Sequence, residues 1–309
     1  MNAKGRLSAV WTAAGYVLVA VIVCVALSAL SAQITTSQLR DQAQWQFARV
    51  QADQPLWEWR FRKSHDLVAN RAFGDAKIVD DDGALAITST GSTPYELGLP
   101  IAWSLDLAHW PILQLELKST DRGELGLVAT SASGVHCLTP AAAALTPDTT
   151  SLRIDLRGLI WKTANGARCP APDVVQMLRL RIDTPEHTTL RLASASLLTT
   201  EPMQLSQQVT INLPDEVTGT GIARFVDRAK DSAMPLFHLP HGIDAESMLS
   251  LRDQLRARWP AALIVAAGTT PQPVAPSSRV SIWWAACVVY LLALIWLAFK
   301  PFKGRSRTW

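Results

Sequence analysis

The chain has 309 residues, of which 49% are hydrophobic and 18% are charged, so it is more apolar than an ordinary soluble protein of about two domains. All 26 acidic residues lie between Asp41 and Asp253, and basic residues near the two ends produce the formal net charge of +3. This distribution gives no signal for nucleic-acid binding, and we expect no nucleic-acid partner.

The first predicted element is a membrane helix near the N-terminus. No charged residue occurs between Arg6 and Arg40, and Leu7 to Leu30 is almost wholly apolar, which is long enough to cross about 30 Å of hydrocarbon. A cleaved signal peptide is the alternative, because Ala29-Leu30-Ser31 resembles a small-residue cleavage site. The apolar run exceeds the usual signal core of about 7 to 15 residues, so we favour an uncleaved anchor within residues 1–32.

A second uncharged span, residues 280–299, is predicted to cross the membrane again. Only basic residues flank the two spans on their outer sides: Lys4, Arg6, Lys300, Lys303, Arg305 and Arg307. Basic flanks stay in the cytoplasm. We therefore expect a protein of the bacterial inner membrane with both termini in the cytoplasm and residues of about 31–279 in the periplasm. The tail at 300–309 is too short for a folded domain, so the protein is expected to act outside the cytoplasm or within the bilayer.

Residues 33–54 are predicted to form a helical stalk that continues the first span outward. Apolar residues recur there at helical spacing, and the sequence Asp53-Gln54-Pro55 is expected to end the helix. The apolar positions are Leu39, Ala43, Phe47 and Val50.

From residue 55 to 200 the pattern changes to short runs with a period of two, which is typical of an antiparallel β-sandwich. In LWEWRFR, the aromatic residues Trp57, Trp59 and Phe61 alternate with charged ones. In YELGLPIAWSLDL, the apolar residues from Tyr95 to Leu107 share one parity and are predicted to face the core, even if Pro100 bends the chain.

Residues 205–268 are predicted to form a small α/β unit in the order strand, helix, strand, helix, strand. The first helix is expected around Ile222 to Ala229, and the second begins after Asp244 as the N-cap and ends before Pro260. Residues 269–279 are predicted to be an extended linker to the second span. The fold class is therefore two transmembrane helices that flank a periplasmic, mainly-β sandwich of jelly-roll type and a small α/β unit.

The four cysteines divide between the membrane and the exported part. Cys24 and Cys287 lie in the predicted spans, whereas Cys137 and Cys169 are the two cysteines of the exported part. An oxidising compartment favours a disulfide between Cys137 and Cys169, which would stabilise the fold by roughly 2 to 5 kcal/mol. Two unrelated buried thiols are the alternative, because spacing alone fixes no geometry.

Four tryptophans are candidates for ligand binding. Trp57 and Trp59 have two interpretations, an aromatic platform for sugar rings or the buried face of a strand, and core packing is the default. Trp110 and Trp161 are the better candidates for exposed rings, because Trp110 breaks the parity before it and Trp161 lies in a turn-like segment. Packing is favoured over ligand contact for these two as well.

Signals for metals and catalysis are weak. His238 and His241 lie three apart without further ligands, and Asp80 to Asp82 fit an acidic turn better than a calcium site. GTGIAR, from Gly219, lacks the third glycine of a dinucleotide fingerprint. Neither G-x-S-x-G nor H-E-x-x-H occurs, so we expect no catalytic residue, no metal and no cofactor.

The β-rich part ends in VVQMLRLRIDTPEHTTLRLASASLL, which resembles galactose-binding-like or jelly-roll carbohydrate-binding modules. A sandwich followed by a small α/β unit and a membrane helix also resembles the periplasmic subunit of bacterial cellulose synthase. That subunit is longer and has more than one module of each type, so cellulose itself is not carried over.

These patterns favour a non-enzymatic accessory subunit of the inner membrane. Its sandwich would bind glycan or a partner protein within a polysaccharide synthesis or export complex, and its helices would contact the bilayer and an integral membrane protein. A sensory or assembly subunit that relays a periplasmic signal is the second hypothesis, and a glycan-modifying enzyme is the third.

Overall fold

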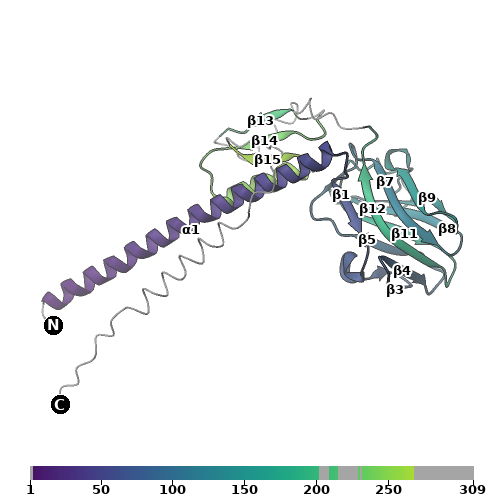
Figure 1. Ribbon diagram of the computed structural model, residues 1–309, viewed down its shortest axis with the longest axis horizontal. Coiled ribbons are helices and arrows are strands. Elements are labelled where there is room, and N and C mark those ends of the chain that lie inside the picture. Colours follow the sequence, from purple (N-terminus) through teal and green to yellow (C-terminus); the bar gives the residue numbers. More distant parts are fainter. Residues whose placement is uncertain (1–2, 202–208, 215–228, 230–231, 268–309) are drawn as a thin grey trace, which may run out of the picture. The chain divides into compact units, whose positions relative to one another are not determined.

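The structure is a computed structural model that describes residues 3–201, 209–214, 229 and 232–267 (Figure 1). The predicted second span at 280–299, the linker at 269–279 and the basic tail at 300–309 lie outside the described residues. So do GTGIAR and the helix expected from Ile222, except for Ala229.

Helix α1 spans Ala3–Gln51 without interruption (Figure 1). Large apolar side chains from Val17 to Leu27 are exposed on it, because nothing in the described chain covers them. This helix is long and apolar enough to cross a membrane, and a signal sequence near the N-terminus would meet the same criteria.

The helix predicted for residues 33–54 is present to Gln51, and this part of α1 packs against the folded body. Leu39 and Ala43 are buried in two apolar clusters that also contain strands of the α/β unit. The helix ends at Gln51, and Asp53 then adopts a positive φ of 53° before Pro55, so the predicted break is confirmed.

Two antiparallel sheets form a sandwich, in agreement with the period of two. Sheet A has the order β10-β7-β12-β4-β3, with β1 also paired to β12. Its strands are β1 Trp57–Arg60, β3 Ala76–Asp81, β4 Ala84–Ser89, β7 Ile112–Ser119, β10 Ser151–Asp155 and β12 Thr189–Leu198.

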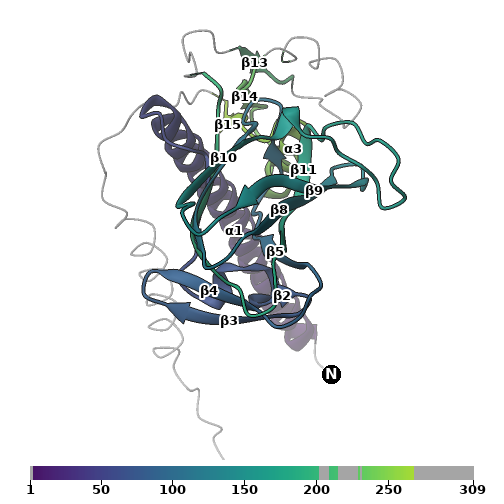
Figure 2. The same ribbon diagram turned by 90° about the vertical axis from the view of Figure 1, so that its right-hand side faces the viewer.

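Sheet B has the order β2-β5-β11-β8-β9, with β6 also paired to β11. Figure 2 shows β8, β9 and β11 of this sheet side by side. The strands are β2 Ala72–Phe73, β5 Tyr95–Leu99, β6 Leu105–Asp106, β8 Gly123–Ser131, β9 His136–Leu145 and β11 Val174–Asp183. Short 3₁₀ turns at Ser64–Asp66, Val68–Asn70 and Leu156–Gly158 connect strands.

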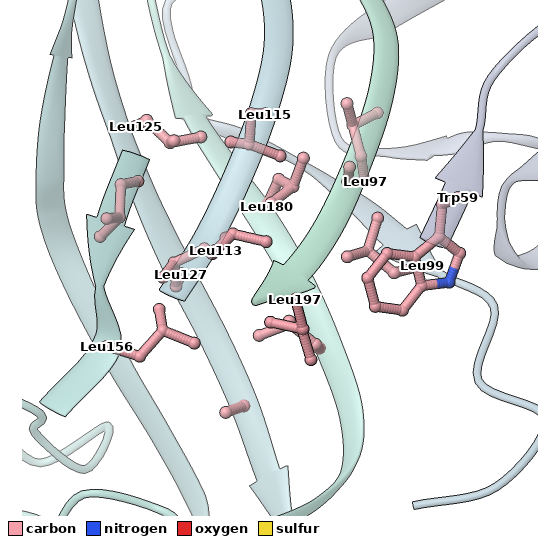
Figure 3. Close-up of a cluster of buried hydrophobic side chains, with 14 of the residues drawn as sticks. Trp59, Leu97, Leu99, Leu113, Leu115, Leu125, Leu127, Leu156, Leu180 and Leu197 are labelled. Carbon is pink, nitrogen blue, oxygen red and sulfur yellow. The ribbon is translucent and has the colours of Figure 1, made fainter. Parts of the chain in front are cut away.

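The core lies between the two sheets and consists mainly of leucines (Figure 3). Leu113 and Leu115 of β7 meet Leu125 and Leu127 of β8 there, and each of the four is 0% exposed. Burying one such side chain is worth about 1.5–3 kcal/mol, so the alternation of leucines on these strands is the main reason that the sheets pack.

The run YELGLPIAWSLDL is not one continuous strand. Pro100 has no amide hydrogen for a ladder, and β5 ends at Leu99 while β6 begins only at Leu105. Ile101 and Trp103 between the strands are half-buried instead of fully buried.

The α/β unit is built on a parallel sheet of β13 Thr210–Asn212, β14 Leu236–Leu239 and β15 Leu263–Ala266. Helix α3, Ala245–Arg258, connects β14 to β15. The carboxylate of Asp244 accepts a hydrogen bond from the Ser247 amide at 2.9 Å, as expected of an N-cap.

Helix α1 completes this unit. Ala43 of α1 packs against Leu236, Leu263 and Val265, while Leu251 and Leu255 of α3 pack against Phe237 and Ile264. Leu39 of α1 lies in the same cluster as Met248 of α3, so α1 contacts both α3 and the sheet.

Candidate polar groove on sheet A

The outer face of sheet A is the candidate functional surface. On β7, Leu113, Leu115 and Leu117 point into the core, so Gln114 and Glu116 between them point outward. The same alternation on β1 buries the two tryptophans and turns Glu58 and Arg60 outward.

Strand pairing aligns these outward side chains into rows across four strands. Figure 1 shows β1, β12 and β7 adjacent, with β12 in the middle. One row contains Arg153, Gln114, Ser196 and Glu58, and the next contains Ser151, Glu116, Ser194 and Arg60. Residues far apart in the sequence thereby form one polar surface.

A groove of about 610 Å³ lies over these rows. It is bounded by the last turn of α1 and the residues after it, and its lining contains three arginines, two glutamates, two glutamines and two serines. A smaller cleft of about 330 Å³ shares Gln54, Pro55 and Leu198 with the groove and is also lined by Arg153 and Glu201. Among the residues that the structure describes, no aromatic side chain lines the larger groove.

Arg49 connects helix α1 to the groove. Its Nε donates to the Pro55 carbonyl oxygen at 2.6 Å, and its Nη2 donates to Glu58 Oε2 at 2.7 Å. Arg60 Nε donates to the other oxygen of Glu58 at 2.8 Å. Hydrogen bonds from Arg49 and then from Arg60 lower the pKa of Glu58, so this carboxylate stays ionised at neutral pH.

Trp45 is an exposed aromatic residue that the sequence analysis did not single out. Trp45 is 43% exposed, and the guanidinium carbon of Arg49 lies 5.1 Å from the centroid of the Trp45 ring. Trp45 lies off the apolar stripe formed by Leu39, Ala43, Phe47 and Val50, and this offset was the available signal for exposure.

The four candidate tryptophans are all buried, which corrects the expectation that Trp110 and Trp161 are exposed. Trp161 is 1% exposed and its Nε1 donates to the Leu156 carbonyl oxygen at 3.1 Å. Trp110 is 2% exposed and packs edge to face on Trp57, with ring centroids 5.2 Å apart. Trp59 is buried too and donates to the Pro100 carbonyl oxygen at 2.7 Å. All four are packed in the core, and Trp110 also lines the smaller cleft of about 330 Å³.

Cys137 and Cys169 form a disulfide in the structure. The bond attaches the segment after β10 to strand β9, where Leu138 and Lys162 also exchange backbone hydrogen bonds of 2.8 and 2.9 Å. Both sulfur-bearing residues are buried.

Among the described residues, no group of three or more His, Cys, Asp or Glu side chains is placed to hold a metal ion. Asp80 accepts a hydrogen bond from the Ser64 amide at 3.0 Å, and Asp81 pairs with Arg191 at 2.7 Å. The acidic turn therefore already has partners within the protein. His238 is partly buried, and burial lowers its pKa.

Comparisons with known proteins give only distant structural neighbours. No protein-family model matches the chain, and no curated protein matches it in sequence. The family 11 carbohydrate-binding module of the cellulosomal cellulase Lic26A-Cel5E of Clostridium thermocellum is similar at 13% identity and a TM-score of 0.33, over 42% of this chain and 86% of that chain.

Two further neighbours have comparable scores. The low-affinity xylan-binding module CBM86 from Roseburia intestinalis is 14% identical over 47% of this chain and 96% of that chain, with a TM-score of 0.29. The agarase AgWH50C is 10% identical over 58% of this chain and 32% of that chain, with a TM-score of 0.34. All three TM-scores lie below 0.5, so we argue function from the groove alone.

Proposed function

We propose that this protein is a non-enzymatic accessory subunit of a bacterial inner membrane, whose sandwich binds a glycan chain in the groove on sheet A. In this proposal the subunit belongs to a polysaccharide synthesis or export complex and contacts an integral membrane partner through its membrane helices. The observation that carries the proposal is the groove itself, a long polar depression beside the end of a helix that is apolar enough to enter a membrane.

The chemistry of the lining supports a polyhydroxylated ligand. Guanidinium groups supply hydrogen-bond donors, carboxylates supply acceptors, and Gln114 with Ser194 and Ser196 supplies both. Arg49 lies about 27 Å further along the helix axis than Ser31. If α1 leaves the membrane near Ser31, the groove lies within about 27 Å of the membrane surface. A glycan leaving a membrane complex would pass within reach.

The ionisation of Glu58 limits the role that it could play in catalysis. A glycosidase needs one carboxyl group with a raised pKa as the general acid and a second, ionised carboxylate. Arg49 and Arg60 lower the pKa of Glu58, so Glu58 does not fit the role of the general acid.

Glycan binding by the full chain in mild detergent tests the proposal. Ser196 lies on the floor of the groove between Gln114 and Glu58, so Ser196→Trp is expected to block the groove and abolish glycan binding. Gln176→Trp, at an exposed position on β11 of the other sheet, is the matched control and should leave binding unchanged. Absence of binding to every glycan on an array would refute the proposal.

The accessory role needs a separate measurement. We expect a second membrane protein to co-purify with the full chain when membranes are solubilised gently. Recovery of the chain alone at every expression level would contradict this part of the proposal.

A sensory subunit is the second candidate, because Arg49 joins the membrane-facing helix directly to Glu58 in the groove. A ligand that displaced this ion pair would change the contact between α1 and β1. Cys24 is exposed on α1. Oxidative cross-linking through Cys24 in membranes can therefore be used to follow the contacts between α1 and a partner helix. Cross-linking that changes when glycan is added would favour the sensor, and cross-linking that stays constant would favour the accessory subunit.

A further inference from the structure

The groove on sheet A has an excess of unpaired positive charge. Three arginines face two glutamates in its lining. Glu58 is shared by Arg49 and Arg60, so one carboxylate neutralises two guanidinium groups only in part. Arg60 uses only its Nε for this contact, and its side chain is 65% exposed, so its terminal nitrogens remain available.

Other cations on the same face are only weakly neutralised within the described residues. Arg62 continues the outward alternation of Glu58 and Arg60; the carboxylate of Asp66 interacts with it electrostatically, but no ion pair within 4 Å joins the two side chains. Lys118 lies one outward position beyond Glu116 on β7, is exposed and is likewise unpaired there. Arg191, aligned with Lys118 across β12, is neutralised by Asp81.

The described residues of the lining include no aromatic ring, which limits what the groove can bind. A neutral sugar would gain little from stacking there, so affinity must come from hydrogen bonds and charge. Hydrogen bonds in which both groups are ionised are roughly twice as strong as neutral ones, and guanidinium groups bind carboxylates in a two-pronged geometry. The lining therefore favours the binding of a ligand that carries carboxylates.

From this juxtaposition we infer that the ligand of the groove is an acidic glycan whose sugar units bear carboxylate groups, with Arg60 and Arg62 as the residues that bind the carboxylates. This inference rests on the proposed glycan-binding function and specifies its substrate class. Glu116, which accepts only a hydrogen bond from Ser194 at 2.8 Å, opposes such a ligand from across the groove. The negative charge of Glu116 therefore lowers the affinity of the groove for every anion. It disfavours a polyanion with closely spaced charges more than a glycan with one carboxylate on each sugar.

Binding of three probes to the full chain in detergent tests the inference. The probes are oligogalacturonate, a neutral cello-oligosaccharide of equal length and poly-L-glutamate. We expect oligogalacturonate to bind at least about tenfold more tightly than the neutral oligosaccharide, and poly-L-glutamate to bind no better than the neutral sugar. Affinity for oligogalacturonate should fall as salt rises, because charge supplies much of it.

Variants that remove charges from the groove show whether each kind of charge strengthens or weakens the binding of oligogalacturonate. The double variant Arg60→Gln, Arg62→Gln should lose about tenfold or more in affinity for oligogalacturonate. The control Arg122→Gln, Arg168→Gln removes the same net charge from exposed positions outside the groove and should lose less than about twofold. Glu116→Gln should strengthen binding of oligogalacturonate by a few fold and leave the neutral sugar unaffected.

Three outcomes would overturn the inference. Equal binding of neutral and acidic oligosaccharides would refute it while leaving the proposed glycan-binding function in place. Equal binding of poly-L-glutamate would show attraction of any polyanion and would refute the assignment to sugars. Failure of every glycan to bind would refute the inference together with the proposed function.

Discussion

Gly126 shows how closely two strands of sheet B approach each other. A Cβ atom at this position would come within 2.5 Å of the Thr139 carbonyl oxygen on β9. The crowding lies beside the register shift between β8 and β9 and involves backbone atoms, which cannot turn aside as a side chain can.

We predict that Gly126→Ala destabilises the protein by about 1–3 kcal/mol, because the added methyl group forces β9 away from β8. Gly158→Ala is the control, since nothing lies within 4 Å of the corresponding Cβ position. Chemical denaturation of both variants gives the comparison, and equal stability of the two would contradict the close approach.

His109 and Asp106 give the sandwich a dependence on pH. Asp106 is buried, and its carboxylate lies 2.9 Å from His109 Nδ1. This hydrogen bond raises the pKa of His109, and the charges of Asp106 and Asp173 act in the same direction. A raised pKa means that protonation of His109 is more favourable in the folded state than in the unfolded state.

The stabilisation by His109 should be complete below the unfolded pKa of about 6.5 and should be lost as the pH rises through the folded pKa. We predict that the difference in free energy of unfolding between the native protein and His109→Gln is larger at pH 5.5 than at pH 8.5. Urea titrations at the two pH values measure it. A difference that grows with pH would contradict the assigned direction.

At the level of single elements, the disulfide between Cys137 and Cys169 closes a loop of 32 residues that contains β10. Strand β10 pairs with β7 at the edge of sheet A, so the cross-link restrains residues that also support the groove. Its main effect is to reduce the conformational freedom of the unfolded chain.

We predict that Cys137→Ser with Cys169→Ser lowers the free energy of unfolding by about 2–4 kcal/mol. Cys24→Ser is the control, because Cys24 is a free, exposed cysteine on α1 and should not affect stability. The expected result is a lower midpoint of denaturation for the double variant alone, and an equal midpoint for both proteins would contradict it.

The elements of the sandwich could be predicted from the sequence because outward positions on the strands alternate with buried apolar residues, most of them leucines. Leu113, Leu115 and Leu117 determine which face of β7 is buried, and the same parity holds for Leu178, Leu180 and Ile182 of β11. Trp161 could not be placed in this way, since a tryptophan in an irregular segment has no period that shows which side packs.

The groove could not be predicted either. Glu58, Gln114 and Ser196 are neighbours only because β1 and β7 both pair with β12, and strand order is not encoded in any local pattern. The ion pair of Arg49 with Glu58 depends on the direction that the chain takes after Gln51. The motif Asp53-Gln54-Pro55 predicts that the helix ends there, but it does not predict that direction.

At the scale of the whole molecule, the membrane assignment rests on α1. We predict that the full chain stays in the membrane fraction after extraction with alkaline carbonate, because the exposed apolar surface from Val17 to Leu27 needs a lipid environment. A variant that lacks residues 1–31 and the predicted second span at 280–299 is the comparison and should be released. N-terminal sequencing that finds the mature chain beginning near Ser31 would show a cleaved signal peptide instead of an anchor.

Helix α1 is synthesised before the strands that cover Ala43 and Phe47, because these strands come from residues beyond 230. During synthesis its apolar stripe stays uncovered until residues beyond 230 have been made. Shortened products of translation that lack these strands would leave the stripe exposed, which favours their aggregation and proteolysis.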